Sequence, residues 1–240
     1  MKNAVVIGAS SGVGKAVAKV LAEKGYAVGL AARRVELLQE LQQELGPNSK
    51  IKQLDLLQPE EAMQKLTELI AEMGEVDLFV IDAGVVFYNK DFEWEKDLIT
   101  LRTNVLGFAA MAHTAMEYLL KQGTGHIVGV TALSAIRGES TRLAYNASKA
   151  FASNYLEGLR VKAYKEKKAI TVTEVQPGWI DTDMAKGRKT FWMATPETAA
   201  RQIYSAIEHK RAHAYITRRW RLYAWLLKLA PRWAYERFLT

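Results

Sequence analysis

The chain has 240 residues, of which 49% are hydrophobic and 25% charged, and it contains no cysteine. This length suits one large α/β domain or two small ones, and the lack of cysteine excludes disulfides and thiolate chemistry. The net charge is +7, but eight basic residues and one acidic residue fall between His209 and Thr240. The rest of the chain is therefore neutral, which argues against nucleic-acid binding by the whole protein.

The first expected elements are a strand, a glycine-rich turn and a helix. Residues 3–7 form a short, mainly apolar run with β-branched residues, and Gly8-Ala9-Ser10-Ser11-Gly12-Val13-Gly14 follows before apolar residues recur at helical spacing. Glycines permit a tight turn and a close ligand approach, and the N–H groups of a helix N-terminus attract an anion. The order favours dinucleotide binding over a plain β–α turn.

A second strand is expected from Ala27 to Ala32, and it ends at Arg33-Arg34. In a dinucleotide-binding sheet this point meets the adenosine ribose. Ala32 is not an acid that would repel a 2′-phosphate, and Arg33 can pair with that phosphate as a fork. The pattern favours NADP(H) over NAD(H). Alternatively, both arginines are solvated residues of the next helical turn, above all Arg34.

Helices and strands alternate along the remaining chain. We expect helices at 35–45, from Pro59 to about 73, within 101–121, at 145–165 and from Pro196, and strands at 51–54, 77–81, 126–131, 170–175 and 214–217. Such alternation implies right-handed crossovers and a parallel sheet. We predict a Rossmann-like, doubly wound parallel sheet of about seven strands with helices on both faces. It forms a single catalytic domain at 1–217, followed by a basic amphipathic extension at 218–240.

Candidate binding residues follow several strands. Asp55 ends the third strand, where a carboxylate bonds an adenine amino group or caps the next turn. Asp82-Ala83-Gly84 follows the fourth strand, and Pro177-Gly178-Trp179-Ile180-Asp181-Thr182 follows the sixth. Residues 183–195 have weak periodicity and an apolar cluster at Phe191-Trp192-Met193, which is typical of a substrate lid.

Tyr145 and Lys149 lie four residues apart at the start of a helical pattern, so both side chains share one helix face. A nearby ammonium favours a phenolate, which predicts a Tyr145 pKa below the usual value of about 10. Such a tyrosine exchanges protons near neutral pH. Asn104 is a polar residue in an apolar helix, where it can bend the helix or hold a water. The alternative is an ordinary amphipathic helix that carries a tyrosine and a lysine.

From about Asn3 to Ile216, these motifs in this order resemble the short-chain dehydrogenase/reductase family. The resemblance implies that Tyr145 is the acid in reduction and the base in oxidation. It implies that Lys149 bonds the nicotinamide ribose and lowers the Tyr145 pKa, and that Asn104 holds a relay water. No metal is expected, and the cofactor carries the hydride. The expected cofactor contacts are Gly8, Ser10, Ser11, Gly12, Val13, Gly14, Arg33, Asp55, Asp82, Ala83, Gly84, Tyr145, Lys149, Pro177, Gly178, Ile180 and Thr182.

Three positions depart from the family's pattern. Ile7 stands where a threonine is usual, and Asp82 stands within the family's Asn-Asn-Ala-Gly turn. Ala132 occupies the place of the catalytic serine. We predict that Ser134, two residues on, supplies the missing hydroxyl. Thr131 is the weaker candidate, because its side chain points to the opposite face if the strand continues.

The sequence therefore predicts an NADP(H)-dependent oxidoreductase for a small carbonyl or alcohol substrate, lipophilic substrates included. The first alternative is a nucleotide-binding protein of the same fold with weak or no catalysis, acting as a sensor or scaffold. The second is a peripheral membrane module. A strand pattern that starts at residue 3 leaves no room for a signal peptide, and no apolar run reaches the ~18 residues of a membrane span. These features favour the cytoplasm, with peripheral contact at the inner membrane face as a variant.

Two further expectations concern surfaces. The helix at 104–121 is too apolar for one sheet to cover, and Phe151, Tyr155 and Leu159 add apolar surface beside it, which predicts a homodimer or homotetramer. In the extension, one helix face can carry Leu222, Trp225, Leu226 and Leu229, and another Arg218, Arg221 and Lys228. That layout suits an interfacial helix on anionic lipid or a helix that covers a lipophilic substrate. Alternatively, the apolar face packs on the domain or on a partner subunit.

Overall fold

The computed structural model describes residues 1–185 and 191–238. Its centre is a seven-stranded sheet in the order β3-β2-β1-β4-β5-β6-β7, and every pair of neighbours is parallel. The predicted doubly wound parallel sheet is confirmed. The strands are β1 (Lys2–Ile7), β2 (Tyr26–Ala32), β3 (Ser49–Gln53), β4 (Leu78–Ile81), β5 (Thr124–Val130), β6 (Ala169–Pro177) and β7 (His213–Ile216).

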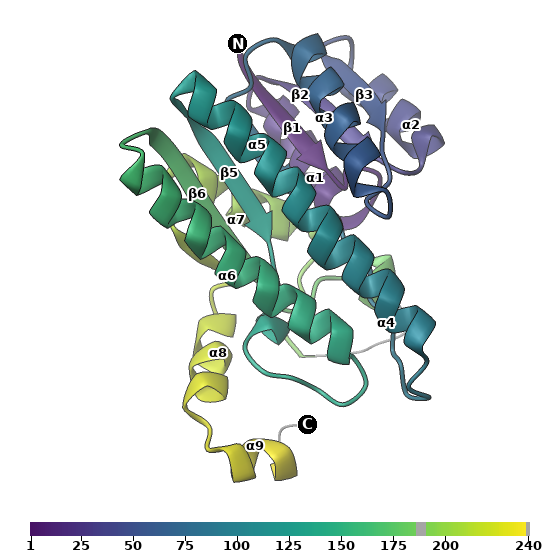
Figure 1. Cartoon of the computed structure of the whole chain (residues 1–240), viewed down its shortest axis with the longest axis vertical. Helices are drawn as coiled ribbons and strands as arrows, with labels where there is room; N and C mark the ends of the chain where they lie inside the picture. The colour runs from purple at the N-terminus through teal and green to yellow at the C-terminus, as the bar shows by residue number, and fades with distance from the viewer. Residues whose placement is uncertain (186–190, 239–240) are drawn as a thin grey trace.

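Helices cover both faces of the sheet (Figure 1). One apolar core joins α1, α2 and α7 to the sheet, and a second core joins α3, α5 and α6 to its other face. The helices are α1 (Gly12–Glu23), α2 (Val35–Leu45), α3 (Pro59–Met73), α4 (Trp94–Leu101), α5 (Phe108–Gln122), α6 (Leu143–Lys165), α7 (Pro196–Glu208), α8 (Trp220–Leu229) and α9 (Arg232–Phe238). A π-helical turn, η1 (Arg102–Gly107), joins α4 to α5, and η2 (Leu133–Ala135) and η3 (Asp183–Ala185) are short 3₁₀ turns.

The strand order reverses direction between β1 and β4. The segments that leave these strands therefore diverge, which opens a crevice at the carboxyl edge of the sheet. Gly8, with φ of +98°, begins the segment after β1, and a Cβ there would lie 2.7 Å from the backbone nitrogen of Ala83. Only glycine allows this approach. The crevice therefore begins where the predicted glycine-rich turn meets the Asp82-Ala83-Gly84 turn.

Helix α5 is covered within the single chain. Phe108, Met111 and Leu119 are buried, and α3 and α6 flank the helix on either side. Phe151 and Tyr155 of α6 stack with ring centroids 5.5 Å apart and pack against the same core. Neighbouring helices therefore bury the apolar side chains of α5 itself, whereas Leu106, in the preceding turn η1, is 55% exposed. The homodimer or homotetramer stays a prediction.

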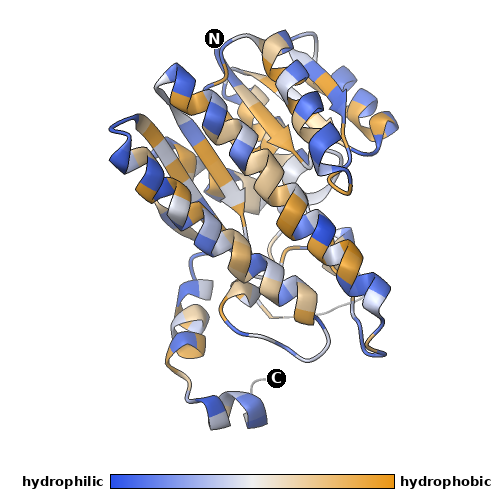
Figure 2. Cartoon of the chain, viewed as in Figure 1, coloured by the Kyte–Doolittle hydropathy of each residue, from blue (hydrophilic) through white to orange (hydrophobic). Residues whose placement is uncertain are grey.

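The chain leaves the sheet after β7 and ends in α8 and α9, which extend beyond the two helical layers (Figure 1). Figure 2 shows that β1 and β5 are mainly orange, as buried strands should be, whereas α8 carries both orange and blue residues. Among the described residues, no helix combines the length and apolar character that crossing a membrane requires.

Candidate active site

The glycine-rich turn and the segment after β6 form one end of the crevice. A Cβ at Gly14 would lie 2.3 Å from the Gly8 carbonyl oxygen, and one at Gly12 would lie 3.3 Å from Thr182 Cγ2. These glycines therefore hold the turn tightly closed beneath Thr182. Ser11 is the N-cap of α1, but its hydroxyl bonds the Arg34 side chain rather than the helix N–H groups. The first turn of α1 thus keeps backbone donors for an anion.

Arg34, rather than Arg33, contacts this turn. Its Nη2 donates to Ser10 Oγ at 3.0 Å and to Ser11 Oγ at 2.7 Å. Arg34 is exposed at the N-cap of α2, as the alternative has it, but its side chain also turns back to the neighbouring β1 turn. The Arg33 side chain is exposed and lines a separate cavity of about 360 Å³.

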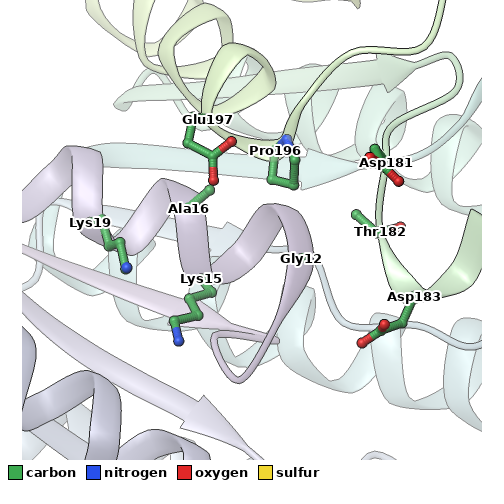
Figure 3. Close-up of a pocket in the computed structure, with 9 residues that line it drawn as sticks. All are labelled: Gly12, Lys15, Ala16, Lys19, Asp181, Thr182, Asp183, Pro196 and Glu197. Carbon is green, nitrogen blue, oxygen red and sulfur yellow. The ribbon is translucent and has the colours of Figure 1, made fainter. Parts of the chain in front are cut away.

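That cavity lies at the carboxyl ends of β2 and β3. Lys52, Lys65, Asp55 and Glu61 line it beside Arg33. Asp55 Oδ1 accepts a hydrogen bond from the Leu57 N–H at 3.0 Å, so the capping role foreseen as an alternative is present. The adenine contact expected of Asp55 stays a prediction. A second cavity, of about 410 Å³, lies between α1 and α7, where Lys15, Lys19, Asp181 and Glu197 surround Gly12 and Thr182 (Figure 3).

Tyr145 and Lys149 lie near the start of α6, and the Lys149 Nζ is 5.8 Å from the centroid of the Tyr145 ring. Burial raises the pKa of Tyr145 to about 12, although Arg142 and a hydrogen bond with Ser134 lower it. The expectation of a depressed pKa is therefore wrong for the groups of this chain. Lys149 Nζ donates a hydrogen bond to the Val130 carbonyl at 3.0 Å, on the strand side.

A buried carboxylate accompanies Lys149. Burial raises the pKa of Asp82 to about 7, and the Lys149 ammonium and the Gly14 N–H oppose that rise. Burial also lowers the pKa of Lys149, and Asp82 partly restores it. The aspartate at this position thus puts a carboxyl group with a pKa of about 7 between the glycine-rich turn and α6.

Asn104 lies inside the π-helical turn η1 and is buried. Its Oδ1 accepts from the Val85 N–H, and its Nδ2 donates to the Val85 carbonyl, both at 2.8 Å. Nδ2 also donates to Ser148 Oγ at 3.2 Å, and Ser148 donates to the Tyr145 carbonyl. The helix is distorted at this residue, as expected, and the side chain connects the segment after β4 to α6. Its role toward a water stays a prediction.

Ser134 is the hydroxyl that the structure brings to Tyr145. The two side chains are hydrogen bonded, and Ser134 lies in the 3₁₀ turn η2, just after Ala132. Thr131 is buried and donates to Glu174 Oε1 at 2.9 Å, on the side of β6. The preference for Ser134 over Thr131 therefore agrees with the arrangement of the loop.

Arg142 and the two aromatic rings that it contacts were not predicted as catalytic residues. The Arg142 guanidinium lies 5.4 Å from the Tyr88 ring centroid and 5.6 Å from that of Trp179. It also pairs with Glu139, which leaves the cation fixed beside the phenol. Arg142 precedes Tyr145 by three residues, and that spacing was the available signal. Tyr88 carried no sequence signal, whereas Trp179 lies in the candidate binding segment after the sixth strand, although no role was predicted for it.

The segment after β6 continues into the expected lid. The Gly178 N–H donates to the Ile216 carbonyl at 2.6 Å, and Ile180 pairs with Ala194. Residues 186–190 of the expected lid lie outside the described residues. Beyond them, Phe191 and Trp192 pack against Trp220 with ring centroids 5.4 and 5.6 Å away. Aromatic side chains thus cover this end of the crevice.

A doubly wound parallel sheet, with a glycine-rich turn at its switch point and a tyrosine–lysine pair at its carboxyl edge, defines an oxidoreductase of the Rossmann class. The family model for short chain dehydrogenase matches residues 2–191, and the chain belongs to this family.

Individual relatives agree with this assignment. An uncharacterized oxidoreductase of Myxococcus xanthus is 35% identical over 188 residues, which span 76% of this chain and 74% of that protein. A 3-oxoacyl-[acyl-carrier-protein] reductase of Bos taurus is 31% identical over 77% of this chain and 78% of its own length. The structure of an alcohol dehydrogenase from the archaeon Thermococcus sibiricus, complexed with 5-hydroxy-NADP, matches with a TM-score of 0.78 and 25% identity, over 90% of this chain and 94% of that one.

Proposed function

We propose that the protein is an NADP(H)-dependent oxidoreductase that acts in the cytoplasm on a small carbonyl or alcohol. The observation that carries the proposal is the cluster of Tyr145, Ser134 and Lys149 at the carboxyl edge of β5, facing the crevice beside the glycine-rich turn. When bound, the nicotinamide supplies or accepts the hydride.

The crevice fits such a cofactor. The closed turn at Gly8 and Gly14, together with the first turn of α1, offers backbone donors to a pyrophosphate. Arg34 with Ser10 and Ser11 offers a guanidinium and two hydroxyls at the ribose end, and Arg33 and Lys52 line the adjoining cavity. Asp55 and Glu61 also line this cavity, and Lys52 pairs with Glu68 and Glu72, so it is the two guanidinium groups that support a cofactor with a 2′-phosphate.

The proton chemistry follows from the state of Tyr145. With its pKa at about 12, the phenol is neutral at pH 7 and can donate a proton to a carbonyl oxygen as the carbon gains a hydride. The Ser134 hydroxyl orients the phenol and bonds the same substrate oxygen. Lys149 and Arg142 stabilise the phenolate that this transfer leaves. In the oxidation direction the phenolate takes the alcohol proton.

Tyr88 and Trp179 flank the reaction point with Arg142 between them, which supports a lipophilic or aromatic substrate.

We also propose the division into a catalytic domain at 1–217 and an extension at 218–240. A homodimer or homotetramer through α5 and α6 rests on family resemblance and on Val161 and Tyr164 of α6, which are exposed. Light scattering at micromolar concentration tests the subunit number, and a monomer would contradict it.

The function is tested by following NADPH loss with a panel of ketones, aldehydes, sugars and long-chain keto compounds. Tyr145→Phe should lose at least about a hundredfold in kcat, because it removes the proton donor, and should keep its NADPH affinity. Tyr164→Phe, an exposed tyrosine on the same helix, is the matched control. Full activity in Tyr145→Phe would refute the assigned chemistry, and binding of NADPH without turnover of any substrate would favour the non-catalytic alternative.

A further inference from the structure

The C-terminal extension is attached to the active-site segments by one side of α8. Trp220, Ala224 and Leu227 are buried, and a Cβ at Gly178 would lie 2.2 Å from the Trp220 ring. Arg137, in the loop that follows Ser134, donates to the Leu227 and Ala230 carbonyls at 3.0 and 2.6 Å. These contacts fix the orientation of α8 on the catalytic domain, so its opposite side cannot turn inward.

That opposite side is apolar and exposed. We call its five residues the outer face: Leu222, Trp225, Leu226, Leu229 and, on α9, Trp233, which are between 51% and 71% exposed. The four on α8 recur at helical spacing and lie across the helix axis from Trp220, Ala224 and Leu227. The structure therefore excludes the alternative in which this face packs on its own domain.

Basic side chains border the outer face. Arg221 and Lys228 run along one edge of α8, and Arg218, Arg219, Arg232 and Arg237 lie at the ends of the two helices, all exposed. Glu236 is the one acidic residue from 218 to 238, and it pairs with Arg232 at 2.6 Å. The patch thus combines exposed leucines and tryptophans with an excess of positive charge.

The combination of apolar and basic side chains indicates whether a second copy of the chain or a lipid bilayer covers the outer face. A second copy related by a two-fold axis would bring the same basic patch against itself, which like charges oppose. An anionic bilayer offers an apolar interior for the leucines, a headgroup region suited to tryptophan, and a negative surface potential for the cations.

We propose that the outer face binds the surface of an anionic lipid bilayer, with α8 lying in the interface plane. At 10 residues, α8 is about 15 Å long and cannot span the bilayer. Because its inner side packs on Gly178 and the Ser134 loop, docking places that end of the crevice near the lipid. This last consequence rests on the proposed function, whereas bilayer binding does not.

The test is cosedimentation of the full chain with vesicles of phosphatidylcholine alone or with phosphatidylserine added, at low salt. We expect the protein to pellet with the anionic vesicles and to stay largely in solution with the neutral ones. Trp225→Ser with Leu229→Ser, and separately Arg221→Glu with Lys228→Glu, should each weaken partitioning at least tenfold. Val161→Ser with Tyr164→Ser, which removes exposed apolar side chains from α6, is the matched control and should still bind.

Circular dichroism and NADPH affinity check that each variant is folded. Loss of lipid binding with NADPH turnover unchanged would separate this proposal from the proposed function. Failure to pellet with anionic vesicles at low salt would overturn it. So would equal pelleting of the outer-face variants and the unaltered chain. A smaller particle in light scattering for Trp225→Ser with Leu229→Ser would assign the face to contacts between copies instead.

Discussion

Replacing Ser134 with alanine tests whether this hydroxyl substitutes for the one absent at Ala132. Ser134 is hydrogen bonded to a Tyr145 phenol that is neutral at pH 7. In the ground state this bond joins two neutral groups and is worth about 0.5–1.5 kcal/mol. As charge develops on the substrate oxygen, the hydroxyl becomes a donor to an anion, which is worth about 1.5–3 kcal/mol.

The second value governs the chemical step, so kcat should fall roughly 10- to 150-fold in Ser134→Ala, which overlaps the loss typical of a missing oxyanion donor. The measurement is steady-state NADPH oxidation with the best substrate of the panel, alongside NADPH affinity from fluorescence titration. The affinity should hold, because Ser134 is not among the groups that line the glycine-rich turn. Ser140→Ala, on the same loop and exposed, is the matched control.

The companion variant Ala132→Ser decides the interpretation. If Ser134 carries the role, a second hydroxyl at residue 132 should change kcat little. The reasoning would be refuted if Ser134→Ala left kcat unaltered while Ala132→Ser raised it about a hundredfold, since the chain would then be an enzyme impaired by its own alanine.

Three other predictions follow from the same geometry. Burial raises the pKa of Tyr145 to about 12, so kcat for alcohol oxidation should rise roughly tenfold per pH unit below that value. The kcat for carbonyl reduction should stay constant near neutral pH. A flat oxidation profile would contradict this. Arg34→Ala should weaken NADPH binding by about 1.5–3 kcal/mol and leave the affinity for NADH unchanged, with Arg33→Ala as the comparison. Equal affinity of the unaltered protein for both cofactors would refute NADP(H) selectivity. Trp220→Ala should lower the free energy of unfolding in urea by about 3–5 kcal/mol, whereas the exposed Trp225→Ala should change it little.

The order and type of the elements followed from the sequence because local patterns encode them. Short apolar runs placed the seven strands, apolar residues at helical spacing placed most helices, and α2 and α3 begin and end where expected. The start of α7 shows the reason, since Thr195 accepts from the Thr198 N–H at 3.2 Å and Pro196 takes the first helical position. Such signals act within a few residues, so the chain carries them before it folds.

The state of the candidate site depended on contacts that no local pattern contains. Burial reversed the expected shift of the Tyr145 pKa. The Val130 carbonyl, 19 residues away, accepts the hydrogen bond from the Lys149 side chain. The side chain of Arg34, and not that of Arg33, reached the serines of the glycine-rich turn, which lie more than 20 residues earlier.

For the C-terminal extension, too, the sequence determined one part of the result and the tertiary structure the other. Its sequence determined an amphipathic helix with leucines and tryptophans at helical spacing and with flanking cations. Only the tertiary structure decided which side meets the domain, because Trp220 fits against a glycine at residue 178 and Arg137 holds the helix end. Helical spacing sets which residues share a face, whereas the partner of that face is set by surfaces that folding brings together from distant parts of the chain.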